Sequence, residues 1–482
     1  MAAPCPSCAE LKLRIAEQDR QIAELKALLA KALQRIDVLE AQVRKNSRNS
    51  SRPPSSDPPE AKGSSQDPPS GRKPGGQPGH PGHQRPLLPP EQMDERVDVK
   101  PPDCRHCGAK LRGSDRNPEP HQVVEIPEPK PHWTEYLLHT LVCGQCGQTT
   151  VAELPRGVPR GAFGPRLQAF LAVCTGVYHL SKRQVTELLQ DWCKVPMSLG
   201  SVTAAEETVS GALAEPVAAA RAYVERQKVV NVDETGWYVK HRRAWLWVAV
   251  TMWVIVFQIH AKRSTNAAMD LLGGRRFRGV LGSDRWTAYL AWTVYERQLC
   301  WAHLIRDFTA FSEMKGSASR IGWAFLDDAR LLFEWWHRVR DGTMSRSEFQ
   351  ELIGPVRWRV RRLLRQGLGC RTRAVRATCG QLLKLFPAMW TFAHTKNVEP
   401  TNNAAERAIR PAVLWRKGCF GTQSAKGNRF AERIMTAAMT LKRQKRSVAD
   451  FVVRACEAAL HGHRTPSLLP TAGVLRVARQ AA

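Results

Sequence analysis

Apolar residues recur every seven positions near the N-terminus, and a second, largely apolar series fills the companion positions of each heptad. This a/d pattern predicts a coiled coil over residues 10–45, and β-branched a positions with Leu at several d positions favour a parallel dimer. A single amphipathic helix that packs on its own chain is the alternative. The a positions are Ile15, Ile22, Leu29, Ile36 and Val43, and the d positions are Leu11, Gln18, Leu25, Ala32 and Leu39.

The heptad pattern is lost over residues 46–102, where Ser, Pro, Gly and Arg dominate. Such a segment buries too little apolar area to offset its chain entropy, so we expect an extended, mobile linker. Apolar periodicity returns over residues 160–225 and predicts consecutive helices, one of them capped by Ser181. Two short helices joined by a tight turn favour a helix-turn-helix-like DNA-binding region. The acidic residues Glu206 and Glu207 support the alternative, a helical packing domain.

Short apolar runs then replace the helical pattern. Residues 228–235 predict a strand that ends in two adjacent acids, and residues 244–260 supply two further strands. A short helix is expected near residues 264–274, followed by a fourth strand over residues 278–286 that also ends in an acid. Acids at the ends of the first and fourth strands fit the first part of an RNase H-like core, which we place at residues 226–303.

The chain after this core is again rich in helix formers. We expect a helical insertion over residues 304–397, and a helix with a third acid followed by further helices over residues 398–482. We interpret Trp335, Trp336 and Trp358 as core residues of the insertion. Its many Arg residues either follow DNA phosphates or form a solvated face. The predicted fold class is therefore multidomain α/β.

Two Cys-x2-Cys pairs lie within residues 103–155, and each is followed at once by Gly, which permits the tight turn of a metal-binding knuckle. Four thiolates match tetrahedral structural zinc, so the pairs predict a zinc ribbon, with four reduced cysteines as the alternative. Strands are expected between the pairs, at residues 122–126 and 133–142. The predicted zinc ligands are Cys104, Cys107, Cys143 and Cys146.

Two further short metal-type motifs are weaker. Cys5 and Cys8 form another pair, which has a matching pair nearby only if the coiled coil dimerises. Cys300 and His303 form a C-x2-H half-site with no second pair close in sequence, and we interpret it as a structural or DNA-positioning element. The N-terminal residues, MAAPCPSCAE, contain no secretory signal, which predicts a cytoplasmic, nucleoid-associated protein with reduced cysteines.

The charge of the chain points to its partner. Among 482 residues, 72 Lys and Arg face 44 Asp and Glu, which gives a formal net charge of +28. A surplus of this size attracts polyanions, of which nucleic acid is the commonest, so double-stranded DNA is the expected partner. The most hydrophobic stretch, residues 244–257, is shorter than the roughly 20 residues of a membrane helix, and no membrane contact is expected.

Carboxylates are the candidate catalytic groups. Side chains alternate between the faces of a strand, so Asp233 and Glu234 should point apart and only one of them can face a metal site. Two acids on strand ends and a third from a helix can hold two Mg²⁺ ions, with Mn²⁺ as a substitute, for phosphodiester chemistry. Plain surface acids are the alternative. For Glu406 the alternative is a helix capping box with Asn403 as the N-cap.

Several motifs together resemble transposases of the insertion-sequence-66 family, which carry an Asp-Asp-Glu triad. The resemblance runs in the family's order over essentially the full chain, and it implies that Asp233, Asp284 and Glu406 are the first, second and third catalytic acids. One departure is Arg285-Trp286, where similar proteins usually have Gly-Tyr. The motifs are NSRNSSRPPSSD and RKPGGQPGH in the linker, the zinc-type cysteines, VDETGW (232–237), SDRWTAY (283–289), QLCWAHLIRDF (298–308) and TNNAAERAIRP (401–411).

The resemblance implies a transposase that cleaves DNA at the ends of an insertion sequence and transfers the strands by two-metal chemistry. Its expected partners are the terminal inverted repeats, the target DNA, a second copy of the chain through the coiled coil, and further element-encoded proteins. One alternative is a non-catalytic DNA-binding regulator or a decayed transposase, and another is a different RNase H-like nuclease. The complete set of three acids favours the active enzyme, and the long insertion argues against a compact nuclease.

Overall fold

The computed structural model describes residues 6–43 and 86–471. Cys5 and most of the predicted linker therefore lie outside the described residues. The chain divides into two units, residues 62–132 and a larger unit made of residues 1–61 and 133–482. We describe each unit by itself.

The N-terminal heptads form one continuous helix, α1 (Pro6–Val43). The helix predicted for this segment is confirmed, whereas its pairing with a second copy stays a prediction. Its heptad residues expose large apolar surfaces: Ile22 is 48%, Leu25 64% and Leu29 60% exposed. A helix gains little stability in water without burying its apolar face, so this stripe is the feature that a partner helix would cover.

The described part of the smaller unit, residues 86–132, contains a short 3-10 helix, η3 (Pro90–Gln92), and no strand. The strand predicted over residues 122–126 is therefore wrong. Val123 and Val124 are 80% and 73% exposed, and a strand without a paired neighbour or a buried face is not stable. Apolar residues are present here, but the high exposure of Val123 and Val124 shows that the described residues of this unit do not cover them.

A two-stranded antiparallel hairpin surrounds the second Cys pair. Its strands are β1 (Thr140–Val142) and β2 (Thr149–Val151), with Leu141 opposite Thr150. The strand predicted over residues 133–142 is correct only for its last three residues, and β2 was not predicted. All six residues of these strands are exposed, so the hairpin is held by its backbone hydrogen bonds and not by burial of apolar side chains.

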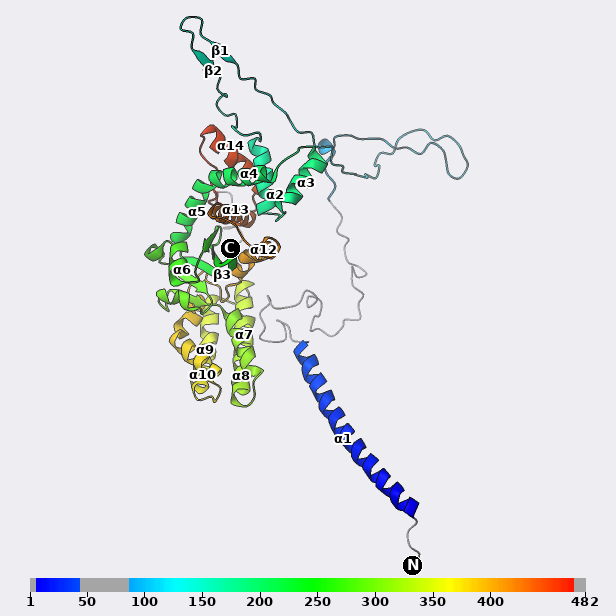
Figure 1. The fold of residues 1–482 in the computed structure, drawn as a ribbon, viewed down its shortest axis with the longest axis vertical. Helices are drawn as coiled ribbons and strands as arrows, with labels where there is room; N and C mark the ends of the chain where they lie inside the picture. Colours follow the sequence, from blue (N-terminus) through cyan, green and yellow to red (C-terminus); the bar gives the residue numbers. More distant parts are fainter. Residues whose placement is uncertain (1–5, 44–85, 472–482) are drawn as a thin grey trace, which may run out of the picture. The chain divides into compact units, whose positions relative to one another are not determined.

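The centre of the larger unit is a five-stranded mixed sheet in the order β5-β4-β3-β6-β7 (Figure 1). Strands β3, β4 and β5 are antiparallel neighbours, whereas β6 pairs parallel with both β3 and β7. The three strands predicted first and the fourth after a short helix are confirmed, as is the mixed α/β class. The strands are β3 (Val229–Val239), β4 (Arg242–Val250), β5 (Ile255–His260), β6 (Val280–Ser283) and β7 (Arg297–Leu299).

Helices cover both faces of this sheet because its strands carry apolar residues on both sides. One face buries Val232 and Trp247 against α5 (Ala214–Glu225) and α6 (Thr265–Leu271). The opposite face buries Val248 against α12 (Asn403–Cys419). Each face therefore has its own core, and α12 belongs to the face that carries the odd-numbered residues of β3.

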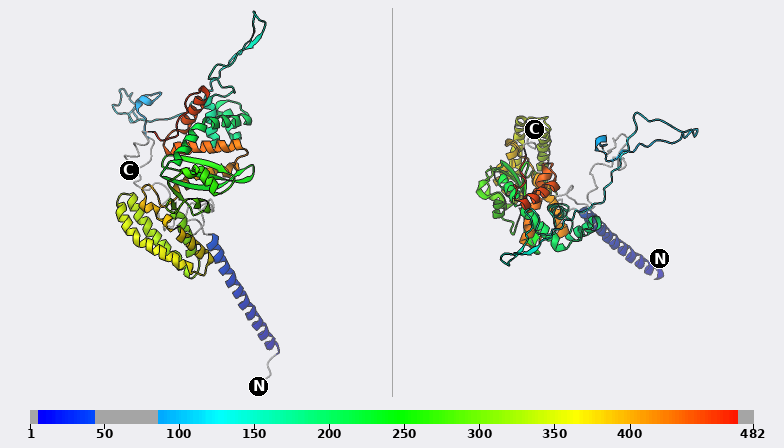
Figure 2. Two further views of the ribbon diagram at one scale, coloured as in Figure 1. Left: turned by 90° about the vertical axis from the view of Figure 1, so that its left-hand side faces the viewer. Right: turned by 90° about the horizontal axis from the view of Figure 1, so that it is seen from above.

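A C-terminal helix, α13 (Ala425–Arg443), closes the outer edge of the sheet (Figure 2). An edge strand exposes unpaired N–H groups, which would be a liability for aggregation. Three α13 side chains spaced four residues apart accept the free N–H groups of β5 at every second residue. The pairs are Ile255 with Thr440 at 3.0 Å, Phe257 with Thr436 at 3.0 Å, and Ile259 with Glu432 at 2.6 Å. The last described helix is α14 (Val448–His461).

The helical region predicted over residues 160–225 is confirmed and consists of α2 (Pro165–Gly176), α3 (Lys182–Cys193), α4 (Leu199–Ala212) and α5. Ser181 caps α3 as predicted, in a capping box with Gln184. The acids of α4 are engaged in ion pairs: Glu206 pairs with Lys182 and Glu207 with Lys426, each at 2.8 Å. The proposed DNA contact of this region stays a prediction.

Five helices and a 3-10 turn lie between β7 and α12, with their own core, and α8 and α9 run alongside each other (Figure 1). Trp336 is buried and Trp335 is half-buried in this core, as predicted, but Trp358 is 62% exposed, so its assignment to the core is wrong. Trp358 lies on the outer side of α9, where no other element covers it. The elements are α7 (Trp301–Ser312), α8 (Ser317–Arg340), α9 (Arg346–Leu368), α10 (Arg373–Lys384), η6 (Phe386–Met389) and α11 (Thr391–His394).

The stretch 244–257 is divided between β4 and β5. Among the described residues, no helix combines the length and the apolar character that crossing a membrane requires.

Candidate active site

The first two acids of the predicted triad sit on neighbouring parallel strands. Asn231 of β3 is paired with Gly282 of β6, and two residues further along the chain are Asp233 of β3 and Asp284, which directly follows β6. The prediction that β3 ends at its acids is wrong, because β3 continues to Val239 alongside β4. What ends near Asp233 is the pairing with β6, whose last paired residues are Asn231 and Gly282.

The third acid, Glu406, lies in the first turn of α12. The capping-box alternative for this residue is wrong, because the N-cap is Asn402 and no side chain caps the helix. Asn402 is fully buried, and its side-chain amide instead donates to the backbone oxygen of Val232 at 2.8 Å. This bond fixes the start of α12 to β3 immediately before Asp233.

The three carboxyl groups interact electrostatically. Burial raises the pKa of Asp233 well above its usual range, and the negative charges of Glu234, Glu406 and Asp284 raise it further. Its Oδ1 accepts the backbone N–H of Glu234 at 2.9 Å, which opposes the rise. The charges of Asp284 and Glu406 thus both act on Asp233, although 122 residues separate Asp284 from Glu406 in the chain.

Glu234 points to the opposite face of the sheet, as the alternation of a strand predicts. Its side chain accepts a hydrogen bond from Arg263 Nε at 2.7 Å and another from the hydroxyl group of Tyr289. Burial raises the pKa of Glu234, as does the charge of Asp284, while Tyr289 and Arg263 hold it down. These partners hold the Glu234 side chain on the face of the sheet opposite to α12 and Glu406. Its charge nevertheless acts on Asp233.

Asp284 is held by its own backbone surroundings. Its Oδ1 accepts the N–H of Trp286 at 2.9 Å, and its carbonyl oxygen accepts a bond from Arg297 at 3.2 Å. Arg297 is completely buried, and this burial lowers the pKa of its guanidinium group to about 10. A buried cation beneath Asp284 was not expected from the sequence, because Arg297 lies in a short strand with no motif around it.

The departure from the family pattern at Arg285-Trp286 is accommodated by new contacts. Arg285 makes a two-pronged ion pair with Asp307 of α7, with both N–O distances 2.9 Å, and also donates to Gln381 of α10 at 2.6 Å. Trp286 lies under the guanidinium group of Arg263 at 4.0 Å. Both residues therefore connect the turn after β6 to neighbouring elements and leave Asp284 in place.

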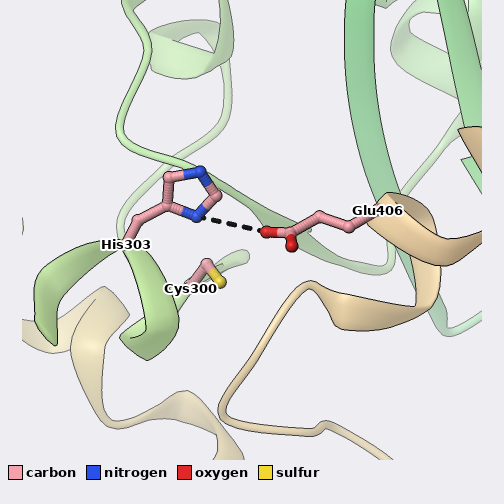
Figure 3. A group of neighbouring side chains, drawn as sticks. All are labelled: Cys300, His303 and Glu406. Carbon is pink, nitrogen blue, oxygen red and sulfur yellow. Dashed lines mark ion pairs between the residues drawn. The ribbon is translucent and has the colours of Figure 1, made fainter. Parts of the chain in front are cut away.

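Cys300 and His303 come together with Glu406, a link that sequence spacing did not reveal (Figure 3). Their sulfur, nitrogen and oxygen atoms lie within 4.8 Å of one another, and His303 Nδ1 is 3.5 Å from Glu406 Oε1. Burial lowers the pKa of His303, which favours its neutral ring. The second half of this C-x2-H site is thus an acid more than 100 residues away in the chain.

Each predicted zinc knuckle has the local geometry of a thiolate loop. The N–H of Gly108 donates to Cys104 O at 2.9 Å and that of Gly147 to Cys143 O at 2.8 Å, and both glycines have positive φ, +74° and +70°. Hydrogen bonds from the loop backbone lower the pKa of Cys104 and of Cys143. The two knuckles lie in different units, so zinc binding by all four cysteines stays a prediction.

Comparison with families of known proteins places the chain among the transposases. A model of the family described as "Transposase IS66 family" matches residues 160–429, which is more than half of the chain. The chain therefore belongs to this family, and the resemblance seen in its motifs is confirmed. A model of a family of unknown function (DUF6444) matches residues 4–86. No match was found among curated proteins.

Proposed function

We propose that the chain cleaves DNA at the ends of an insertion sequence and transfers the strands, with Asp233, Asp284 and Glu406 as its catalytic acids. The observation that carries this proposal is geometric: the β3–β6 register brings Asp233 and Asp284 alongside each other, and the Asn402 bond to Val232 docks the start of α12, with Glu406 in its first turn, on β3. Desolvation and the charges of neighbouring acids raise the pKa of Asp233, so a cation bound beside its carboxylate would offset an unfavourable charge.

The donor set fits magnesium. Three carboxylates supply only oxygen atoms, which Mg²⁺ prefers, and Glu406 Oε1 is shielded from solvent without a hydrogen-bond partner among the described residues. Asp233, Asp284 and Glu406 would hold two Mg²⁺ ions, with Mn²⁺ as a substitute. Such a pair of ions, when bound, stabilises the attacking and the leaving oxygens of a phosphodiester. The chain itself contributes the placement of the acids, through the β3–β6 register and the Asn402 bond.

The order of the sheet supports an RNase H-like assignment for this core. Three antiparallel strands are followed by two parallel ones, and acids stand on the two central strands, β3 and directly after β6. A third acid comes from α12 on the face that Asp233 shares. A DNA-binding protein without catalysis would have no use for three acids brought to neighbouring strands and the adjoining helix, which favours the enzyme over the regulator.

Helix α9 offers a surface for the DNA. Five arginines lie between residues 357 and 365. Trp358, Arg362 and Arg365 are exposed and share one helix face, and the Arg362 guanidinium group lies 5.1 Å from the Trp358 ring. Cationic side chains beside an exposed aromatic ring suit a nucleic-acid backbone and an unstacked base. We propose that this face of α9 contacts DNA phosphates.

Acid substitutions test the catalytic assignment. We expect Asp233→Asn, Asp284→Asn and Glu406→Gln each to bind DNA that carries the element ends as the native protein does, and to lose Mg²⁺-dependent cleavage. Glu457→Gln, which changes an exposed acid of α14, is the matched control and should cleave normally. Unchanged Mg²⁺-dependent cutting by all three site variants would contradict the assignment.

A further inference from the structure

A cysteine, a histidine and a glutamate meet where helices α7 and α12 begin. Cys300 is the N-cap of α7, His303 lies in its first turn, and Glu406 lies in the first turn of α12. Two hydrogen bonds join these helix starts. The N–H of Trp301 donates to Pro400 O at 2.9 Å, and the N–H of Asn402 donates to the Cys300 sulfur at 3.1 Å. The two halves of the cluster are therefore held together by the backbone.

Two polar atoms of this cluster lack the hydrogen bonds that buried polar atoms usually make. His303 Nδ1 and Glu406 Oε1 are shielded from solvent and have no hydrogen-bond partner among the described residues. The side-chain oxygen of Asn402, a residue that is 1% exposed and adjacent to the Cys300 sulfur, is also without one. Buried polar atoms normally find a partner, so the facing atoms of His303 and Glu406 point to a missing ligand.

The separations fit a metal ion better than a direct hydrogen bond. His303 Nδ1 and Glu406 Oε1 are 3.5 Å apart and face each other, with the Cys300 sulfur beside them (Figure 3). Ligand atoms at zinc bond lengths in a tetrahedron stand roughly 3.3–3.8 Å from one another. All three atoms already lie within 4.8 Å of one another. The side chains of His303 and Glu406 are 31% and 37% exposed, which leaves them room to close the difference.

The mixed donor set selects the class of metal. A thiolate and an imidazole nitrogen favour zinc and similar borderline-soft ions, whereas magnesium prefers oxygen atoms alone. We propose that Cys300 Sγ, His303 Nδ1 and Glu406 bind a zinc-class divalent cation, with a fourth position left for water or a further donor. Binding releases the thiol proton of Cys300 to solvent and leaves the thiolate on the metal.

The shared acid gives this site a consequence for activity, which rests on the proposed function. Glu406 cannot serve the zinc-class ion and the magnesium pair in the same geometry, because the first draws its carboxylate toward His303 and Cys300. Zinc-class ions at this site therefore oppose Mg²⁺-dependent cleavage. The site acts as an inhibitory switch on the catalytic helix α12.

Metal content of the full-length protein tests the binding itself. We expect Cys300→Ser and His303→Gln each to retain one equivalent of zinc per chain less than the native protein after equilibration with zinc and gel filtration. Cys419→Ser, which alters a half-buried cysteine at the other end of α12, is the matched control and should keep the native content. All of these variants keep the zinc-type cysteines at residues 104–146, so any zinc bound there is the same in each protein and cancels in the comparison.

Cobalt provides an independent measure, because a thiolate on Co²⁺ gives a charge-transfer absorption band that a carboxylate alone does not give. The Co²⁺ difference spectrum of native protein minus Cys300→Ser should show this band, and that of native protein minus Cys419→Ser should not. Equal metal content and equal Co²⁺ spectra in all four proteins overturn the proposal. So does loss of the ion in Cys419→Ser as well as in Cys300→Ser.

Cleavage assays then test the switch separately. In Mg²⁺, added zinc should slow native cleavage at least tenfold and leave Cys300→Ser unaffected. Equal inhibition of both proteins refutes the switch, whatever the metal content shows. If neither protein cuts DNA while the metal content differs by one equivalent, the proposed function fails and the metal site stands.

Discussion

Replacing Asp233 by Asn separates the effect of this acid on the stability of the folded protein from its proposed role in cleavage. An amide keeps an oxygen that can accept the Glu234 N–H, which Asp233 Oδ1 now accepts at 2.9 Å, and it has nearly the same shape. What it removes is the negative charge that burial and the neighbouring acids make unfavourable. We therefore expect Asp233→Asn to abolish cleavage and at the same time to stabilise the folded protein near neutral pH.

The sign follows from the direction of the pKa shift. The folded protein raises the pKa of Asp233 above its ordinary value of about 3.9, so the folded state binds the proton more tightly than the unfolded state does. The stability of the native protein is thus full below about pH 4 and falls as pH rises through the elevated folded-state pKa. Each pKa unit by which the folded state raises Asp233 lowers the free energy of unfolding of the native protein by about 1.4 kcal/mol at a pH above the elevated pKa. The Asp233→Asn variant carries no such charge and does not suffer this loss.

Magnesium should reverse the difference. A cation that binds only the folded native protein adds about 1.4 kcal/mol to its free energy of unfolding at ten times the dissociation constant. The Asp233→Asn variant has lost a ligand, so its stability should respond much less.

The assay is urea denaturation of the native protein and the variant from pH 4 to pH 8, with EDTA or with Mg²⁺. Glu457→Gln, an exposed acid on α14, is the control and should follow the native protein throughout. The reasoning is refuted if Asp233→Asn and the native protein have the same free energy of unfolding at every pH and gain equally from Mg²⁺.

Three further predictions concern the edge of the sheet, the DNA surface and the N-terminal helix. Thr436→Val leaves the buried N–H of Phe257 without its acceptor and should cost about 1–3 kcal/mol in urea denaturation; no loss would contradict the role of α13 at the edge. Arg365→Ala should weaken DNA binding in filter assays and lower the slope of log affinity against log salt by about 1, whereas an unchanged slope excludes a phosphate contact. Replacing both Ile22 and Leu29 by Lys should turn an oligomer into a monomer in sedimentation equilibrium, and an unchanged mass would refute α1 pairing.

Elements with a strong local pattern were predictable. The period of seven gave the helix over Pro6–Val43, and Ser181 marked the start of α3 with its own capping box. The runs around Asp233 and Asp284 gave β3 and β6, because alternating or continuous apolar residues are enough to define strands once another layer covers them. The same reasoning failed at residues 122–126, where the apolar pattern is present but no layer exists to bury it.

The partners of the candidate site were harder to predict, because they depend on contacts between distant segments. Local spacing could not show that Asn402, rather than Asn403, is the N-cap of α12, because Asn402 is held there by a bond from its side chain to Val232 of β3. Nor could it show the buried Arg297 beneath Asp284, or the exposure of Trp358.

The sequence by itself determined the candidate acids, the strong positive charge and the order of helices and strands, because side-chain type and local periodicity carry that information. Only the tertiary structure decided that the charges of Asp284 and Glu406 act on Asp233, and that Glu406 also faces His303. The reason is that parallel pairing of β3 with β6, and the docking of α12 on β3, join residues that no local interaction brings together.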